Sequence, residues 1–116
     1  MGRLTTHVLD TANGCPASGI AVSLYRVSDG RELIAEAITN SDGRLDQPLL
    51  QDEAFTIGAY ELTFEAGDYF RSIQAELPEP AFVDQVVLRF GIASPEQHYH
   101  VPLLVSPWSY STYRGS

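Results

Sequence analysis

The chain has 116 residues, which is enough for one domain with a single buried core but too few for two. Fifteen acidic residues against seven basic ones give a formal net charge of -8 and an isoelectric point near 4.6. This charge argues against nucleic acid and anionic membranes as partners of the whole chain, because both would be repelled. We therefore predict a single acidic domain that covers residues 1–116.

The N-terminal sequence MGRLTTHVLD has no charged start followed by an apolar run, as a secretory signal would have. No apolar stretch approaches the roughly 18 residues that a membrane span needs. From these two features we expect a cytoplasmic protein.

Short runs of β-forming residues separated by turn signals predict an all-β sandwich. In chain order, strands are predicted over residues 3–10, 20–27, 31–39, 60–65, 82–90, 98–105 and 108–113. Asp29-Gly30 predicts a hairpin between the second and third strands. Residues 67–74 lack alternation and predict a short helix that carries Tyr69, Phe70 and Ile73 toward the core. The expected fold is an antiparallel β-sandwich of seven or eight strands with one short helix.

The strand predicted over residues 98–105 is apolar on both faces. Alternation places Val101, Leu103 and Val105 on one face, and the opposite face carries His98, His100, Pro102 and Leu104. One face can pack in the sandwich core and the other can contact a second subunit. We therefore predict a symmetric oligomer.

The candidate reactive groups are imidazoles and a guanidinium. All three histidines lie in the first and the last long predicted strands: His7, His98 and His100. Arg44 follows the Asp42-Gly43 turn. Taken singly, a strand histidine is more often simply half exposed and an arginine after a turn is more often solvated. The lone Cys15 cannot form an internal disulfide and is interpreted as an ordinary loop thiol.

Two chemistries fit these groups. In the first, His98 and His100 would bind zinc together with His7, leaving an open position for water. In the second, one neutral imidazole deprotonates water without a metal while an arginine neutralises charge on a carbonyl oxygen. The C-terminal residues add polar groups suited to either reaction, because Ser109, Ser111 and Tyr113 share one strand face.

Three segments together resemble the transthyretin-related family of 5-hydroxyisourate hydrolases: THVLDTANGCPA, TNSDGRLDQPLL and HYHVPLLVSPWSYSTYRGS. The resemblance extends over residues 4–116. It implies a transthyretin-like sandwich of two four-stranded sheets and a homotetramer, a dimer of dimers whose active sites lie at the dimer-dimer interface. The implied reaction opens the six-membered ring of 5-hydroxyisourate with water and yields 2-oxo-4-hydroxy-4-carboxy-5-ureidoimidazoline. No metal or organic cofactor is implied.

The resemblance also implies site residues, motif by motif. The implied catalytic residues are His7 of HVLD, Arg44 of DGR, His100 of HxHVP, and Ser116 of the terminal YRGS. The implied substrate-binding residues are His7, Arg44, Tyr113, Arg114 and Gly115. The sequence does not decide whether His7 or His100 is the base, and His98 is assigned only as a neighbour of the site.

A binding protein is the alternative from another functional class, because the resemblance extends to transthyretin, a hormone carrier. A channel for an apolar hormone would be expected to carry mainly aliphatic and small side chains. In this chain the equivalent channel, at the implied dimer-dimer interface, would carry His7, Arg44, His100 and Tyr113. The residues therefore favour the enzyme.

Overall fold

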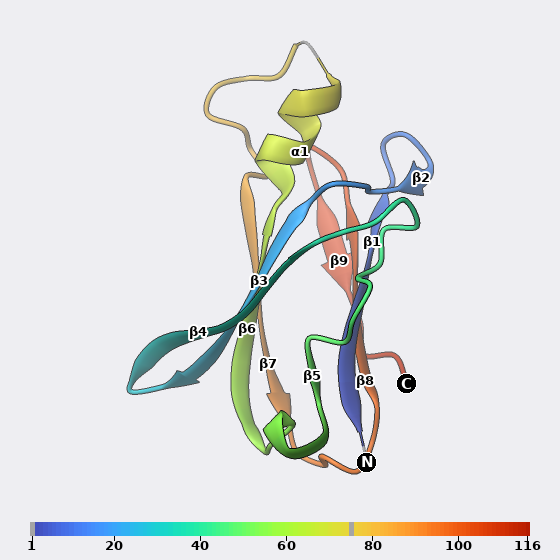
Figure 1. Ribbon diagram of the computed structural model, residues 1–116. Coiled ribbons are helices and arrows are strands. Elements are labelled where there is room, and N and C mark those ends of the chain that lie inside the picture. The colour runs from blue at the N-terminus through green and yellow to red at the C-terminus, as the bar shows by residue number, and fades with distance from the viewer. Residues whose placement is uncertain (1, 75) are drawn as a thin grey trace.

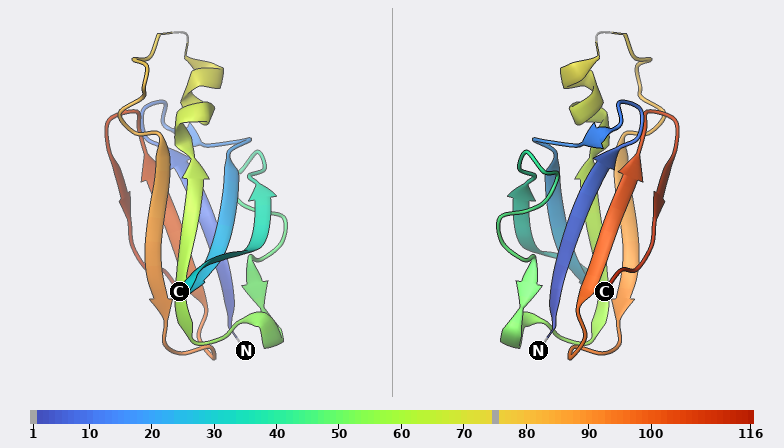
Figure 2. Two further views of the ribbon diagram at one scale, coloured as in Figure 1. Left: turned by 90° about the vertical axis from the view of Figure 1, so that its left-hand side faces the viewer. Right: turned by 90° about the vertical axis from the view of Figure 1, so that its right-hand side faces the viewer.

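The computed structural model describes residues 2–74 and 76–116 and has two β-sheets packed face to face (Figure 1). The views in Figure 2 show each sheet in turn, with the helix at one end of the sandwich and both termini toward the other. This arrangement confirms the predicted all-β sandwich with one short helix.

The first sheet has the order β2-β1-β8-β9, and the short strand β5 also pairs with β1. Its strands are β1 (Arg3–Asp10), β2 (Cys15–Pro16), β5 (Leu50–Gln51), β8 (Tyr99–Val105) and β9 (Tyr110–Thr112). The second sheet has the order β4-β3-β6-β7. Its strands are β3 (Ala21–Ser28), β4 (Gly30–Ile38), β6 (Gly58–Glu65) and β7 (Gln85–Ile92). The predicted hairpin is confirmed, because β3 and β4 pair as antiparallel neighbours around Asp29-Gly30.

The first sheet departs from the expected strand directions. β1 and β8 pair in parallel, with Thr5 opposite His100 and His7 opposite Pro102. The prediction of an entirely antiparallel sandwich was therefore wrong for this pair. The two strands are joined through the whole second sheet, so no short turn forces them to run in opposite directions. The strands β2 and β5 were not predicted, because two residues carry no alternation signal.

Alternation along β1 and β8 separates the core from the outer face of the first sheet. Leu4 and Val8 on β1 and Leu103 and Val105 on β8 are fully buried, and they pack against side chains of the second sheet such as Leu24, Tyr60 and Leu62. Each such side chain stabilises the fold by about 1.5 to 3 kcal/mol. The intervening residues Thr5, His7 and His100 are half-buried and face outward. The core thus determines which side chains the outer face presents.

The helix α1 (Ala66–Ile73) leads from β6 toward β7 at one end of the sandwich. Tyr69 and Phe70 are buried as predicted, whereas Ile73 is 50% exposed, so the expectation that Ile73 faces the core was wrong. A helix of eight residues turns only part of its surface to the core, and Ile73 lies in its last turn. The predicted strand at 82–90 also begins later, at Gln85, and Phe82 instead stacks on Trp108.

A short 3₁₀ helix, η1 (Asp52–Ala54), precedes β6. Among the described residues, no helix has both the length and the apolar character needed to cross a membrane.

Candidate active site

A pocket of about 340 Å³ opens on the outer face of the first sheet. Side chains of β1 and β8 form its floor, and the loop after β4 and the C-terminal residue form its sides. The lining residues are Arg3, Thr5, Thr6, Arg44, Leu45, Gln47, His98, His100 and Ser116. Three of the four residues that were predicted to be catalytic therefore line one pocket.

His7, the fourth of these residues, lies beside the pocket on β1. The Nε2–H group of its ring donates a hydrogen bond of 2.8 Å to the carbonyl oxygen of Asp42. A carbonyl can only accept, so Nε2 of His7 carries a proton in this arrangement. His7 also forms an isolated antiparallel bridge with Arg44, which brings the two predicted site residues together.

The loop of residues 40–44 holds Arg44 through its backbone. The Asn40 side-chain oxygen accepts bonds from the amides of Asp42 and Arg44 at 2.9 and 3.1 Å, and the Asn40 amide donates to the Arg44 carbonyl at 2.8 Å. Gly43 has a φ of 74°, and its carbonyl accepts the Val8 amide of β1 at 2.8 Å. A Cβ at Gly43 would overlap the Val8 carbonyl oxygen. The turn thus requires glycine, and it fixes Arg44 against β1.

His100 is held on two sides. Its Nδ1 lies 2.8 Å from the Thr5 hydroxyl of the neighbouring strand, and the backbone of Gly115 lies against its Cβ and Cδ2. The amide and carbonyl of His100 also pair with those of Gly115. Burial lowers the pKa of His100 below its ordinary value, and the positive charge of Arg44 and the proximity of His7 lower it further. His100 is therefore held as a neutral imidazole at pH 7.

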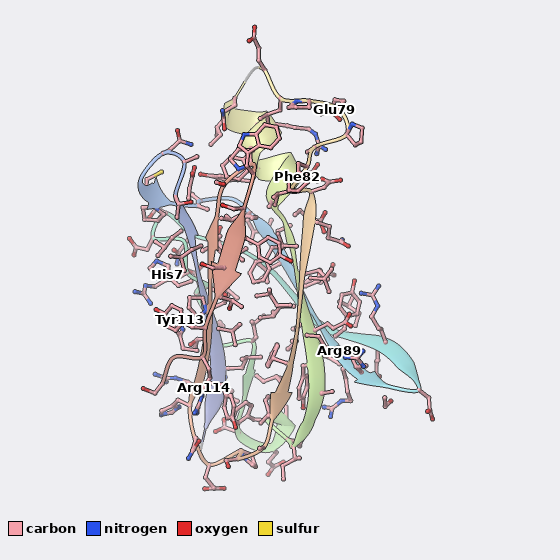
Figure 3. All side chains as sticks on the ribbon, turned by 180° about the vertical axis from the view of Figure 1, so that it is seen from behind. His7, Glu79, Phe82, Arg89, Tyr113 and Arg114 are labelled. Atoms are coloured by element: carbon pink, nitrogen blue, oxygen red, sulfur yellow. The ribbon has the colours of Figure 1, made fainter. Side chains whose placement is uncertain are left out.

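The C-terminal tail is anchored by Arg114. Its guanidinium lies 4.1 Å from the centre of the Tyr99 ring, and its Nη2 donates to the His98 carbonyl at 2.9 Å and the Gln97 side chain at 3.2 Å. Together with the pairing of Gly115 to β8, this anchor places Ser116 at the pocket. Figure 3 shows the labelled His7 and Arg114 along the sheet of β1 and β8, and Arg89 beside the other sheet.

Of the five predicted substrate-binding residues, Arg44 alone lines this pocket; His7 and Gly115 lie beside it, and Tyr113 and Arg114 lie elsewhere. Tyr113 is 60% exposed, and with Arg114 it lines a separate pocket of about 330 Å³ between β7 and β8. The structure brings together His7, Arg44, His100, Gly115 and Ser116 and leaves Tyr113 and Arg114 on the neighbouring side. The expected hydroxyl face of the tail is likewise exposed at Ser109 and Ser111, away from the pocket.

Sequence reasoning missed several pocket residues. Thr5 and Arg3 precede His7 by two and four positions on β1, so strand alternation could have placed them on the same face. Gln47 lies three residues after Arg44 in a segment without regular structure, and nothing in the sequence pattern indicated that it would line the pocket. His98 does line the pocket on the same side as His100, as strand alternation predicted.

The pocket chemistry bears on the two alternatives. Within residues 2–74 and 76–116, no group of three or more histidine, cysteine, aspartate or glutamate side chains is arranged to hold a metal ion. The three histidines of the zinc hypothesis therefore do not converge in the protomer. Two guanidinium groups and two imidazoles line the pocket, which suits a polar planar molecule rather than an apolar hormone.

Comparison with known proteins places this pocket in context. The model of the HIUase/Transthyretin family matches residues 4–115. A 5-hydroxyisourate hydrolase of Pseudomonas aeruginosa is 68% identical over all of this chain and 93% of its own length. The structure of Klebsiella pneumoniae 5-hydroxyisourate hydrolase superposes with a TM-score of 0.83 at 35% identity, with full coverage of both chains. The structure of an (S)-allantoin synthase superposes with a TM-score of 0.94 at 53% identity; the match covers 99% of this chain but 44% of that longer one.

Proposed function

Because this chain belongs to the HIUase/Transthyretin family, we propose that it is a 5-hydroxyisourate hydrolase of urate breakdown. The reaction adds water to the six-membered ring of 5-hydroxyisourate and gives 2-oxo-4-hydroxy-4-carboxy-5-ureidoimidazoline. The high identity to curated hydrolases over the whole chain supports this activity. The observation that carries the assignment is the convergence of Arg44, His100 and Ser116 in one pocket, with His7 beside it.

In the proposed mechanism His100 is the general base. A neutral imidazole can accept a proton from water, and burial and the nearby Arg44 keep the pKa of His100 low enough for that role at pH 7. The water oxygen bonds to a ring carbonyl carbon, and the guanidinium of Arg44 stabilises the resulting oxyanion. The ring C–N bond then breaks, and the leaving nitrogen takes the proton from the imidazolium of His100. The product then carries a carboxylic acid and a ureido N–H group: the water oxygen and one of its hydrogens are in the acid, and the other hydrogen is on the nitrogen. The acid ionises and releases a proton to solvent, which gives the carboxylate.

His7 is proposed to position Arg44 and to contact the substrate rather than to act as the base. Its Nε2–H is already donated to the Asp42 carbonyl, on the loop that carries Arg44. Ser116 offers a hydroxyl at the pocket wall, where it can orient the attacking water. Gly115 supports this arrangement by backing the His100 ring.

The assembly proposed for the active enzyme is a homotetramer, a dimer of dimers with its sites at the dimer-dimer interface. In support, the pocket lies on an open outer face, and aromatic side chains at the end of the same sheet are exposed in the protomer, among them Trp108, Tyr110 and Tyr113. In such an assembly Tyr113 and Arg114 would bind substrate by facing a channel shared between protomers. We propose the cytoplasm as the place of the reaction.

The activity is tested by labelling the oxygen atom of the attacking water and following it into the product. 5-Hydroxyisourate is generated in situ from urate by urate oxidase, and the protein is added in water enriched in ¹⁸O. We expect faster decay of the substrate and one ¹⁸O atom in the new carboxylate. Decay at the uncatalysed rate with a folded protein would refute the proposed function, and faster decay without incorporation of the label would refute hydrolysis.

A further inference from the structure

Thr5 holds the ring of His100 from the neighbouring strand. The parallel register of β1 and β8 sets Thr5 directly opposite His100, and both side chains face outward because their neighbours on each strand are buried. The Thr5 hydroxyl lies 2.8 Å from Nδ1 of His100. Among the described residues, this hydroxyl is the one side-chain group that bonds the His100 ring.

The opposite edge of the ring is covered by backbone. A Cβ placed on Gly115 would approach Cδ2 and Cβ of His100 at 3.2 Å, so the tail lies in close contact with that edge. Thr5 at Nδ1 and Gly115 at Cδ2 leave the Cε1–Nε2 edge as the part of the ring that can meet a ligand. His100 lines the pocket, and this free edge is the part available to face it.

We propose that Thr5 is a positioning residue that keeps the neutral His100 in the tautomer with its proton on Nδ1. In this arrangement Nδ1–H donates to the Thr5 oxygen, and the lone pair of Nε2 is left to accept a proton from the attacking water. The Thr5 hydroxyl hydrogen turns to solvent in the pocket, which Thr5 itself lines. The inference rests on the proposed role of His100 as the base.

The hydrogen bond between Nδ1 of His100 and the Thr5 hydroxyl also holds the ring when His100 is protonated. After the water proton reaches Nε2, Nδ1–H still donates to Thr5, so the ring does not need to turn before it returns the proton to the leaving nitrogen. Partners that orient metal-ligating histidines typically contribute about ten- to a hundredfold in activity, and we expect an effect of the same order for this orienting bond. Removal of the hydroxyl should therefore lower kcat and leave KM largely unchanged.

The test combines ring ¹⁵N NMR with kinetics on the full-length protein. The wild type, Thr5→Val and Thr5→Ser are compared at a pH where His100 is neutral, and His100→Asn serves to assign the ring signals. We expect a proton on Nδ1 in the wild type and in Thr5→Ser, and a larger population of the Nε2–H tautomer in Thr5→Val. The kcat of Thr5→Val should fall by about ten- to a hundredfold, and serine should restore most of it.

Thr11→Val is the matched control for stability. Thr11 lies in the turn just after β1 and donates its hydroxyl to the Val105 carbonyl of β8 at 3.1 Å. The variant therefore removes a threonine hydroxyl that bonds the same neighbouring strand, at the end far from His100. We expect wild-type kcat and an unchanged His100 tautomer in this variant.

The inference is overturned if wild-type His100 carries its proton on Nε2, a result that can be read even if Thr5→Val fails to fold. It is also overturned if Thr5→Val keeps both the tautomer and kcat. A wild-type protein with the expected tautomer but no hydrolysis would instead refute the proposed function.

Discussion

The surroundings of His100 keep it ready to accept a proton. Its ring is partly buried, and the cationic Arg44 and the ring of His7 lie near it, while Arg3, His98 and Ser116 line the same pocket. Burial and like charge both disfavour the imidazolium, so both lower the pKa of His100. The positive charge of Arg44 thus has two effects: it stabilises the oxyanion, and it lowers the pKa of His100 so that this base stays neutral.

The pH dependence of His100 tests this coupling. Because protonated His100 cannot take a proton from water, kcat should fall as the pH drops through a pKa that lies below the ordinary histidine value of 6.5. Arg44→Gln removes the cation and should raise the pKa of His100, which NMR titration of the ring measures directly.

Arg31→Gln is the control for that titration, because Arg31 pairs with Glu61 and Tyr25 in the second sheet. The same His100 pKa in all three proteins would show that Arg44 does not set it. A lower pKa in Arg44→Gln would contradict the proposed electrostatics.

At the scale of elements, two irregular segments bring site residues to the regular strands. β1 and β8 supply the imidazoles, whereas the 40–44 loop supplies Arg44 and the tail supplies Ser116. Each segment is fastened to a strand by backbone bonds, through Gly43 to Val8 and through Gly115 to His100. A substitution that shifts the backbone of either segment should therefore disturb the geometry of the site, even though it replaces none of the reactive residues.

Gly43→Ala tests this dependence, with Gly14→Ala as its matched control. Both glycines have positive φ, at 74° and 68°, but a Cβ at Gly14 meets no atom within 4 Å, whereas one at Gly43 meets the Val8 carbonyl. Gly14→Ala should lower the free energy of unfolding by about 1 to 2 kcal/mol through the backbone alone, with unchanged activity.

In Gly43→Ala we expect a larger loss of stability and a clear loss of kcat/KM, because the loop must move away from β1 and take Arg44 with it. Urea denaturation and substrate decay measure the two effects. Equal losses of stability in the two variants, with full activity in both, would show that the loop position does not matter.

Removal of Arg114, Gly115 and Ser116 tests the tail. These residues close no part of the core, so the free energy of unfolding should change little. Activity should fall by roughly a hundredfold or more, since misplacement of reacting groups by about 1 Å can have that effect. Arg114→Gln keeps Ser116 but loses the stacking on Tyr99, and we expect an intermediate loss. A truncated chain that unfolds at room temperature would mean that the tail is a structural element.

For the whole molecule, strand periodicity predicted the sandwich and the hairpin at Asp29-Gly30, because alternation directly reflects burial. It also separated the two faces of β8, but it did not predict which of them is buried, since both carry apolar side chains. The parallel β1–β8 pair could not be predicted in this way, since strand direction depends on how distant segments pair. For the same reason the contact of Thr5 with His100 was not foreseen, although the two residues face each other across 95 positions of sequence. The likeness of three motifs, rather than any periodicity, indicated His7, Arg44, His100 and the tail as one site.

The pocket is lined by basic side chains although the molecule as a whole is acidic. The chain carries a formal charge of -8, yet Arg3 and Arg44 both line the pocket and no aspartate or glutamate is among the residues that line it. An acidic protein that gathers arginine and histidine at one place offers a local site for a molecule rich in carbonyl oxygens.

The measurement that tests the central claim most directly is the decay of freshly generated 5-hydroxyisourate with chelator-treated wild type and with His100→Asn, each matched in folding and oligomeric state. The proposed mechanism predicts that the wild type accelerates decay in the presence of chelator and that His100→Asn loses about a hundredfold or more of that acceleration. Equal acceleration by the two proteins, or its disappearance from the wild type on chelation, would contradict metal-free hydrolysis with His100 as the base.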